Sequence, residues 1–253
     1  MKRAYLAVIS VITVICVIVG LARNVHRRRE IVEAEEYETA DAAVYGDEYE
    51  PEEDRNDGTV TGAAVTLAAG SVEIVPGDSF SVSESGIRGL EWGITDDGFL
   101  NVWQEDGEMH SADRTGTVTI TLPADDRMES LDVSVEVGSI DIRDIETESM
   151  SLNCALGDVS AENLYAVGGS ITVETGNANL SGMRFDTMDV HVSLGNISFM
   201  AAQDLTDLAK NFSVDLGSVS INGAQIGKSI ETGGEGSGSL ALTCHMGNIE
   251  VTW

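Results

Sequence analysis

The stretch LDVSVEVGSIDI at residues 131–142 recurs in degenerate form along the carboxy-terminal part of the chain. The glycines that mark its copies, Gly138, Gly157, Gly176 and Gly195, are evenly spaced. The same signature returns around Gly217, Gly247 and, as an outlier, Gly70. A fixed period of about 20 residues is typical of a solenoid, in which each repeat packs only on its neighbours.

When the repeats are aligned on this glycine, apolar and polar columns separate. The columns five before, three before and two after the glycine are apolar, and polar columns lie between them. The apolar residues are Val133, Leu152, Ile171, Val190, Phe212 and Leu242; Val135, Cys154, Val173, Val192, Val214 and Cys244; and Ile140, Val159, Ala178, Ile197, Val219 and Ile249. This alternation places one side of every strand inward and the other in water.

One such repeat cannot bury its own apolar side, but coils stacked at about 4.8 Å share one core. We therefore predict an all-β fold, a parallel β-solenoid of about 19-residue coils over residues 61–253. The residue after each glycine is Ser, Asp or Asn, which favours a tight corner stabilised by side-chain bonds to its own backbone. Longer spacings after Gly195 and Gly217 predict inserted loops near residues 203–210 and 233–238.

The first part of the predicted solenoid is less regular. Short segments of period-two alternation predict strands near residues 80–82, 90–94, 99–103 and 117–122. Asp97 and Gly98 favour a hairpin turn between two of them. Trp92 and Trp103 are expected to belong to a cap or the core, and Trp253 to cover the open edge of the last coil.

Composition excludes several classes of function. The 253-residue chain has 43 acidic and 14 basic residues, a formal net charge of −29, and such a field repels nucleic acid. Three scattered cysteines, Cys16, Cys154 and Cys244, make no disulfide framework and no metal-ligand motif. Cys154 and Cys244 share an inward column four turns of the repeat apart, roughly 19 Å, and are predicted to be reduced core residues.

No catalytic, cofactor-binding or metal-binding residue is predicted. His110, His191 and His245 are isolated in the sequence, and no motif places a serine, cysteine or carboxylate beside them. The stretch at residues 223–229 is one residue too short for a phosphate-binding loop. The corner residues lack the aspartate in every coil that calcium-binding solenoids repeat.

Residues 4–22 contain no charged residue and are long enough for a transmembrane helix. A signal peptide cleaved near Ala22 is the alternative, but the arginines at positions 23, 27, 28 and 29 favour an uncleaved anchor. Those arginines favour a cytoplasmic location for the following segment. The very short amino-terminal tail argues the reverse, so both orientations stay open, and we expect the solenoid outside the cell.

Residues 30–57 are rich in Asp and Glu, and Arg55 is their only basic residue. Apolar side chains are too sparse there to offset the entropy of ordering, which predicts an extended acidic linker. The expected domains are therefore a membrane anchor at residues 1–29, a disordered linker at residues 30–60 and the solenoid at residues 61–253.

Residues 116–142, followed by the glycine repeats, resemble a bacterial family of uncharacterised domains that are labelled putative adhesins. The resemblance rests on a strand that ends at Leu122 and Pro123, on the glycine repeats from Gly138 onward, and on the Asp97–Gly98 turn. It covers about residues 60–253. It implies a β-solenoid, often membrane-anchored, and no catalytic residue.

Three hypotheses for function follow. The first is a non-enzymatic protein anchored through residues 4–22 and displayed on the cell surface or envelope, where it binds a polysaccharide or protein. The second is a scaffold or sensor accessory protein that faces the cytoplasm. The third is a carbohydrate-active enzyme. Such an enzyme needs carboxylates clustered on one face of successive coils, whereas Asp141, Asp158 and Asp215 lie in different columns. Self-association through open solenoid ends is a further expectation, which sedimentation of residues 58–253 would test.

Overall fold

The computed structural model describes residues 60–87, 89–104, 116–123, 127–234, 236 and 238–253, which belong to one compact unit, residues 56–253. This part of the chain is all-β, and its 19 strands join into one sheet. Within it, no helix has the length and apolar character needed to cross a bilayer. The predicted anchor at residues 4–22, the linker and His110 lie outside the described residues, so those predictions remain.

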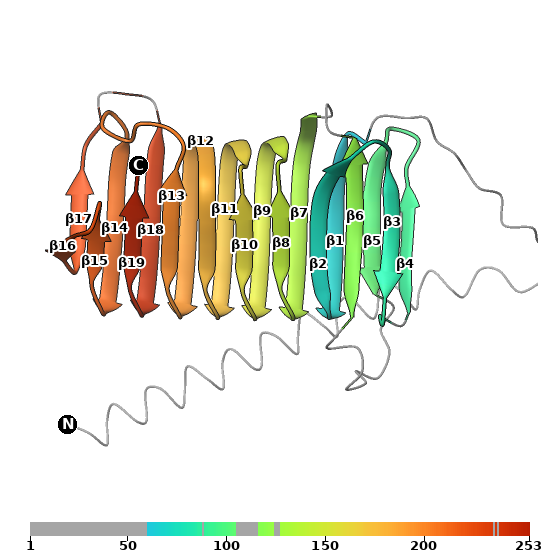
Figure 1. Ribbon diagram of the computed structural model, residues 1–253, viewed down its shortest axis with the longest axis horizontal. Helices are drawn as coiled ribbons and strands as arrows, with labels where there is room; N and C mark the ends of the chain where they lie inside the picture. Colours follow the sequence, from blue (N-terminus) through green and yellow to red (C-terminus); the bar gives the residue numbers. More distant parts are fainter. Residues whose placement is uncertain (1–59, 88, 105–115, 124–126, 235, 237) are drawn as a thin grey trace, which may run out of the picture. The chain divides into compact units, whose positions relative to one another are not determined.

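The sheet folds into two facing layers of strands (Figure 1). The first layer contains, in spatial order, β4 (Leu90–Ile94), β5 (Phe99–Gln104), β1 (Gly62–Ala69), β7 (Arg127–Val137), β9 (Glu146–Leu156), β11 (Tyr165–Thr175), the end of β12 (Ala178–Leu194), β18 (Ser239–Met246), β14 (Ala209–Leu216) and β17 (Ser229–Thr232).

The second layer follows the same order with shorter strands. It contains β3 (Ser81–Ser85), β6 (Thr117–Pro123), β2 (Ser71–Gly77), β8 (Ile140–Arg143), β10 (Val159–Glu162), the start of β12, β13 (Ile197–Ala201), β19 (Ile249–Thr252), β15 (Val219–Ile221) and β16 (Ala224–Gly227). Each coil contributes one strand to each layer. Neighbouring coils pair in parallel, and in the regular part Ile171 lies opposite Leu152 and Val190, the equivalent residues of the coils on either side.

The order of coils in space differs from their order in the chain. The carboxy-terminal strands β18 and β19 lie between the coil of β12 and β13 and the coil of β14 and β15. The first strands, β1 and β2, likewise lie between the coil of β5 and β6 and that of β7 and β8. The expectation that coils stack in chain order is therefore wrong at both ends, because the irregular connections there let the first coil (β1 and β2) and the last coil (β18 and β19) each take an inner place.

Antiparallel strands close both ends of the parallel stack. At one end β3 pairs with β6 and β4 with β5, and at the other β16 pairs with β15 and β17 with β14. The predicted Asp97–Gly98 turn joins β4 to β5, as expected. The long spacing before Gly247 contains β16 and β17 as well as the predicted loop. Trp253 does not cover a last coil, because its coil lies inside the stack.

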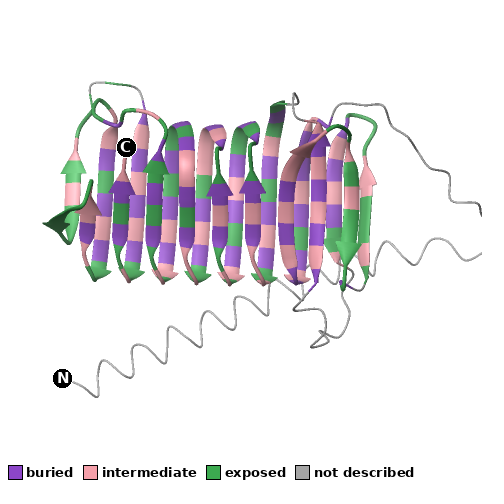
Figure 2. Cartoon of the chain, in the orientation of Figure 1, coloured by how far each residue is buried: buried purple, intermediate pink, exposed green. Residues whose placement is uncertain are grey.

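The predicted inward columns form the core. All their members are buried between the two layers, and buried positions alternate with more exposed ones along the parallel strands of the stack (Figure 2). The repeat pattern therefore predicts burial correctly even where it does not predict the order of the coils. Of the tryptophans, Trp92 lies in the capping strand β4 with its ring 6.0 Å from that of Phe80, and both Trp92 and Trp103 remain partly exposed.

The repeat glycine forms a close-packed corner at the ends of the first-layer strands β7, β9, β11, β12, β18 and β14. From Gly138 to Gly247 its φ lies between 145° and 150°, a region that favours glycine. An added Cβ on Gly176 would lie 1.8 Å from the carbonyl oxygen of Gly157 in the coil beside it. We call this line of glycines the glycine corner. It fixes where these six strands end and so aligns the side chains next to it.

Candidate functional site

An exposed apolar row runs along the glycine corner. It consists of the residues immediately before each glycine, which we call the corner ridge: in spatial order Val137, Leu156, Thr175, Leu194, Met246 and Leu216. Strand alternation would turn these side chains inward, but the strand ends at the glycine and leaves them outside. Leu156, Leu194, Met246 and Leu216 are 52%, 42%, 47% and 62% exposed. The apolar columns predicted from the sequence do not include this one, the residue immediately before each repeat glycine.

A second row lies one residue further from the corner, on the outward face of the first layer. Its members, in spatial order, are Glu136, Ala155, Glu174, Ser193, His245 and Asp215. We call it the acidic row, because half of its members carry carboxylates. The corner ridge is therefore apolar except at Thr175 and is bordered on one side by negative charge.

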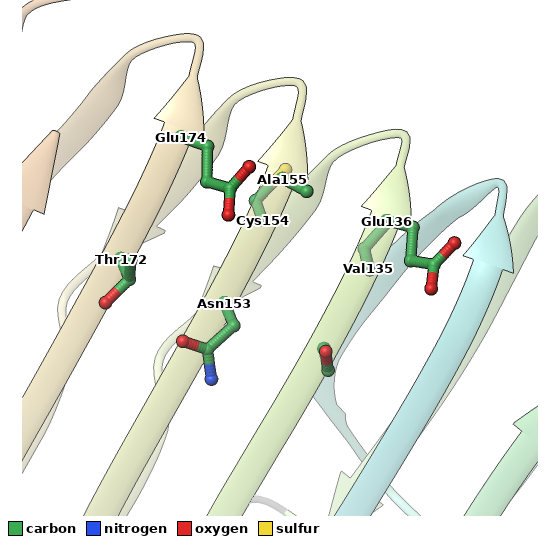
Figure 3. A pocket seen from close by; sticks show the side chains of 8 residues that line it. Val135, Glu136, Asn153, Cys154, Ala155, Thr172 and Glu174 are labelled. Atoms are coloured by element: carbon green, nitrogen blue, oxygen red, sulfur yellow. The ribbon is translucent and has the colours of Figure 1, made fainter. Parts of the chain in front are cut away.

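The acidic row dips at Ala155. A depression of about 190 Å³ lies there, and its wall includes Asn153, Ala155 and Thr172 with Glu136 and Glu174 on either side (Figure 3). The small side chain of Ala155 leaves the space that a longer one would fill. Glu136 and Glu174 stand two coils apart, roughly 10 Å at the strand spacing.

Two histidines and a carboxylate meet further along the same face. The imidazole centres of His191 and His245 are 4.9 Å apart, with the rings inclined at 76°. Nδ1 of His245 lies 2.8 Å from Oδ2 of Asp215, and Nε2 of His191 lies 3.4 Å from Oγ of Ser193. We call His191 and His245 the histidine pair. The interpretation of these two residues as isolated is wrong, because β18 lies directly beside β12.

The chain order hides this cluster. His191 and His245 lie far apart in the sequence, and coils stacked in chain order would place the coil of Asp215 between them. The only trace in the sequence is the pair of long spacings, from Gly195 to Gly217 and from Gly217 to Gly247, which gives the chain enough length to exchange two coils. Nothing in those spacings specifies the exchange itself.

The polar residues immediately after the repeat glycines form hydrogen bonds with neighbouring coils rather than with their own backbone. Oδ1 of Asp158 accepts from the backbone N–H and the Nδ2 of Asn177, at 2.6 and 2.9 Å. Oδ1 of Asn177 accepts in the same way from Asn196, and the series continues through Asn248 to Ser218. This ladder stabilises the stacking of coils. The prediction of local capping at these residues is corrected accordingly.

The two core cysteines are reduced and buried, as predicted. They are three coils apart rather than four, since β18 follows β12 directly, and roughly 14 Å still excludes a disulfide. Each Sγ donates to a glycine carbonyl of a neighbouring coil, Cys154 to Gly138 and Cys244 to Gly195. Burial raises the pKa of Cys154 to about 11 and that of Cys244 above its usual value.

The remaining residues considered in the sequence do not converge. Asp141 lies on β8 and forms a bidentate pair with Arg143, Asp158 belongs to the corner ladder, and Asp215 is on β14. Residues 223–229 lie in the exposed cap around β16. Among the described residues, no group of three His, Cys, Asp or Glu side chains has the geometry of a metal site.

Comparison with known proteins places this fold in a family. No curated protein matches the chain. Two solved structures resemble it: a "putative cell adhesion protein" from Clostridium sporogenes (14% identity, 77% of this chain, 93% of that chain, TM-score 0.41) and a "putative adhesin" from Bacteroides fragilis (12%, 77%, 92%, 0.42). A family model described as Toastrack DUF4097 matches residues 59–251 and confirms the resemblance found in the sequence. The chain therefore belongs to the Toastrack DUF4097 family.

Proposed function

We propose that this protein is a non-enzymatic interaction module, anchored in the membrane by residues 4–22 and displayed outside the cell. The observation that carries the proposal is the corner ridge. Leu194, Met246 and Leu216 follow one another on adjacent coils and form a continuous apolar surface, and Leu156 lies beyond Thr175 on the same line. Continuous exposed apolar surface of this kind marks interaction sites in soluble domains.

The chemistry of the two rows defines the partner. Full burial of a fully exposed leucine side chain contributes about 1.5–3 kcal/mol, and the ridge side chains, which are about half exposed, each contribute roughly half of that to a complex. Glu136, Glu174 and Asp215 border the ridge, within a chain of net charge −29. The partner is accordingly a surface that presents apolar groups together with basic ones, which favours a protein ligand over a neutral polysaccharide.

Location is tested by protease treatment of cells that make the full chain with a carboxy-terminal tag. We expect intact cells to lose the tag while a cytoplasmic control protein survives. Survival of the tag until the cells are lysed would contradict the proposal. It would support the alternative of a cytoplasmic scaffold oriented by the arginines at positions 23, 27, 28 and 29.

The ridge is tested with surfaces of defined chemistry. The purified full chain should be retained more strongly on beads coated with hexylamine groups than on beads that carry short amines alone. The variant Leu156→Ser/Leu194→Ser/Leu216→Ser keeps every charge, so it should lose that difference and keep the binding to short amines. Equal retention of both proteins on both surfaces would show that charge alone accounts for binding.

A further inference from the structure

The exchange of coils creates a cluster of side chains on the outward face of the first layer. His191 on β12 lies opposite Thr243 on β18, and His245 follows two residues later on the same face. Asp215 on β14 lies beside His245 in the acidic row. Three strands from distant parts of the chain therefore bring two imidazoles and one carboxylate together.

The Asp215 carboxylate fixes the chemistry of His245. A carboxylate only accepts hydrogen bonds, so the 2.8 Å contact requires Nδ1 of His245 to donate. The neutral ring then carries its lone pair on Nε2, which is the form that binds metals. A carboxylate behind a histidine in this way is the arrangement that holds metal-binding imidazoles in orientation.

The second imidazole is within reach of the same ion. The ring of His191 lies edge-to-face with that of His245, 4.9 Å between centres, and its contact with Ser193 is long at 3.4 Å. The side chain of His245 is half exposed and that of His191 partly buried, so solvent reaches the pair, and the His191 ring can turn towards the fixed ring of His245. Bonds of about 2.0–2.1 Å from two such nitrogens can converge on one ion.

The donor set selects the ion. Two neutral imidazole nitrogens suit Zn²⁺, Cu²⁺ and Ni²⁺, whereas Ca²⁺ and Mg²⁺ require oxygen ligands. The strongly negative charge of the chain raises the local concentration of cations. With two protein ligands rather than three, water completes the coordination shell.

We propose that His191 and His245 form a surface site for a borderline divalent metal ion such as Zn²⁺, in which Asp215 is a positioning residue for His245. The site goes beyond the proposed interaction function, because it uses different residues from the corner ridge and would exist on either side of the membrane.

The test is a titration of the purified full chain with zinc sulfate, in competition with a chromophoric chelator. We expect one zinc ion that depends on the pair, and a higher urea midpoint of unfolding when zinc is present. His191→Ala and His245→Ala should each lower the affinity at least about tenfold, and Asp215→Ala about 10–100-fold. Calcium chloride should produce none of these effects.

A matched control moves one imidazole along its own column. Thr172 lies opposite His191 on β11, one coil further from His245. The variant Thr172→His/His191→Thr keeps the number of histidines and the net charge but separates the two rings. It should bind zinc as weakly as His191→Ala, and zinc should no longer raise its unfolding midpoint.

Two results would overturn the proposal. One is zinc affinity of the His191→Ala/His245→Ala variant equal to that of the unchanged protein. The other is full zinc binding by the Thr172→His/His191→Thr variant. Metal-free urea unfolding of each variant shows whether it folds, so that a loss of binding is not mistaken for a loss of structure.

Discussion

At the scale of the residue, the glycine corner depends on the absence of a side chain. Gly176 has a φ of 145°, and a Cβ there would meet the Gly157 carbonyl oxygen at 1.8 Å. Both the backbone conformation and the close approach of two coils therefore require glycine. This requirement explains why a glycine recurs at the same position of each repeat in the sequence.

We expect Gly176→Ala to lower the free energy of unfolding by at least about 3 kcal/mol, because strain and a backbone clash add. Urea denaturation followed by circular dichroism measures it. Gly168→Ala on the same strand is the control, since its Cβ would meet nothing closer than Thr187 Oγ1 at 3.6 Å. Equal losses for the two variants would rule out the corner as the cause.

The buried thiols give a second prediction. With a pKa of about 11, Cys154 holds only about a thousandth of its thiol as thiolate at pH 8, and the thiolate is the form that reacts. In a Cys16→Ser background, we expect iodoacetamide to label the folded chain at least about a hundred times more slowly than the chain in urea.

The same shift sets a direction for stability against pH. The pKa of Cys154 is higher in the folded chain than its ordinary value of 9.0, so the folded state favours the protonated thiol. Its contribution is complete below pH 9 and is lost as pH rises towards 11. Cys154→Ala should lack that part of the loss between pH 9 and 11, and an unchanged pH profile would contradict the assignment.

At the scale of the element, a lysine holds the loop that leads into the last outer coil. Lys210 takes an inward position on β14, and its Nζ donates to the carbonyl oxygens of Leu205, Thr206 and Leu208. These bonds compensate the burial of the ammonium group and close the loop that precedes β14. The connection that allows coil exchange is thus anchored at its end.

Lys210→Met should therefore cost about 2 kcal/mol of unfolding free energy, because three carbonyls lose a charged donor at once. Lys228→Met is the matched control: the exposed Nζ of Lys228 donates to a single carbonyl, that of Asp215, and its loss should cost less than about 1 kcal/mol. Urea denaturation distinguishes the two. A larger effect at Lys228 would mean that the loop is held by other contacts.

The sequence predicts which residues form strands far better than it predicts which strands lie side by side. Burial of Val133, Val173 and Ile249 follows from alternation, because period-two patterning is a property of each strand by itself. The order of the coils depends instead on which coil packs against which. Phe212 and Val190 both lie opposite Leu242, and any apolar column member would pack there, so the pattern contains no information about which coil comes next. The histidine pair was missed for this reason.

At the scale of the whole molecule, the chain's first and last described coils lie inside the stack. The edges are formed instead by β3 and β4 at one end and by β16 and β17 at the other. These capping strands are short and antiparallel, a common way to limit further pairing at sheet edges. Self-association through open ends remains a prediction, and it would have to proceed through these caps.

Local unfolding should begin at the capping strands β16 and β17 rather than at β18. In hydrogen exchange, we expect backbone amides of β18 to be protected longer than those of β16 and β17, because β18 pairs on both sides. Mass spectrometry of exchanged peptides would measure this in the full chain. Fast exchange in residues 239–246 alongside slow exchange in residues 224–232 would contradict the observed order of coils.

The inner position of β18 and β19 also constrains how the chain is made. The coil of β14 and β15 leaves the ribosome before β18 and β19, yet it contacts the rest of the stack chiefly through those later strands. Until β19 is complete, the coil of β12 and β13 has no partner on that side. Completion of the stack on this side is therefore tied to the synthesis of β19, and a chain that stops before β18 leaves the edge of the β12 and β13 coil unpaired.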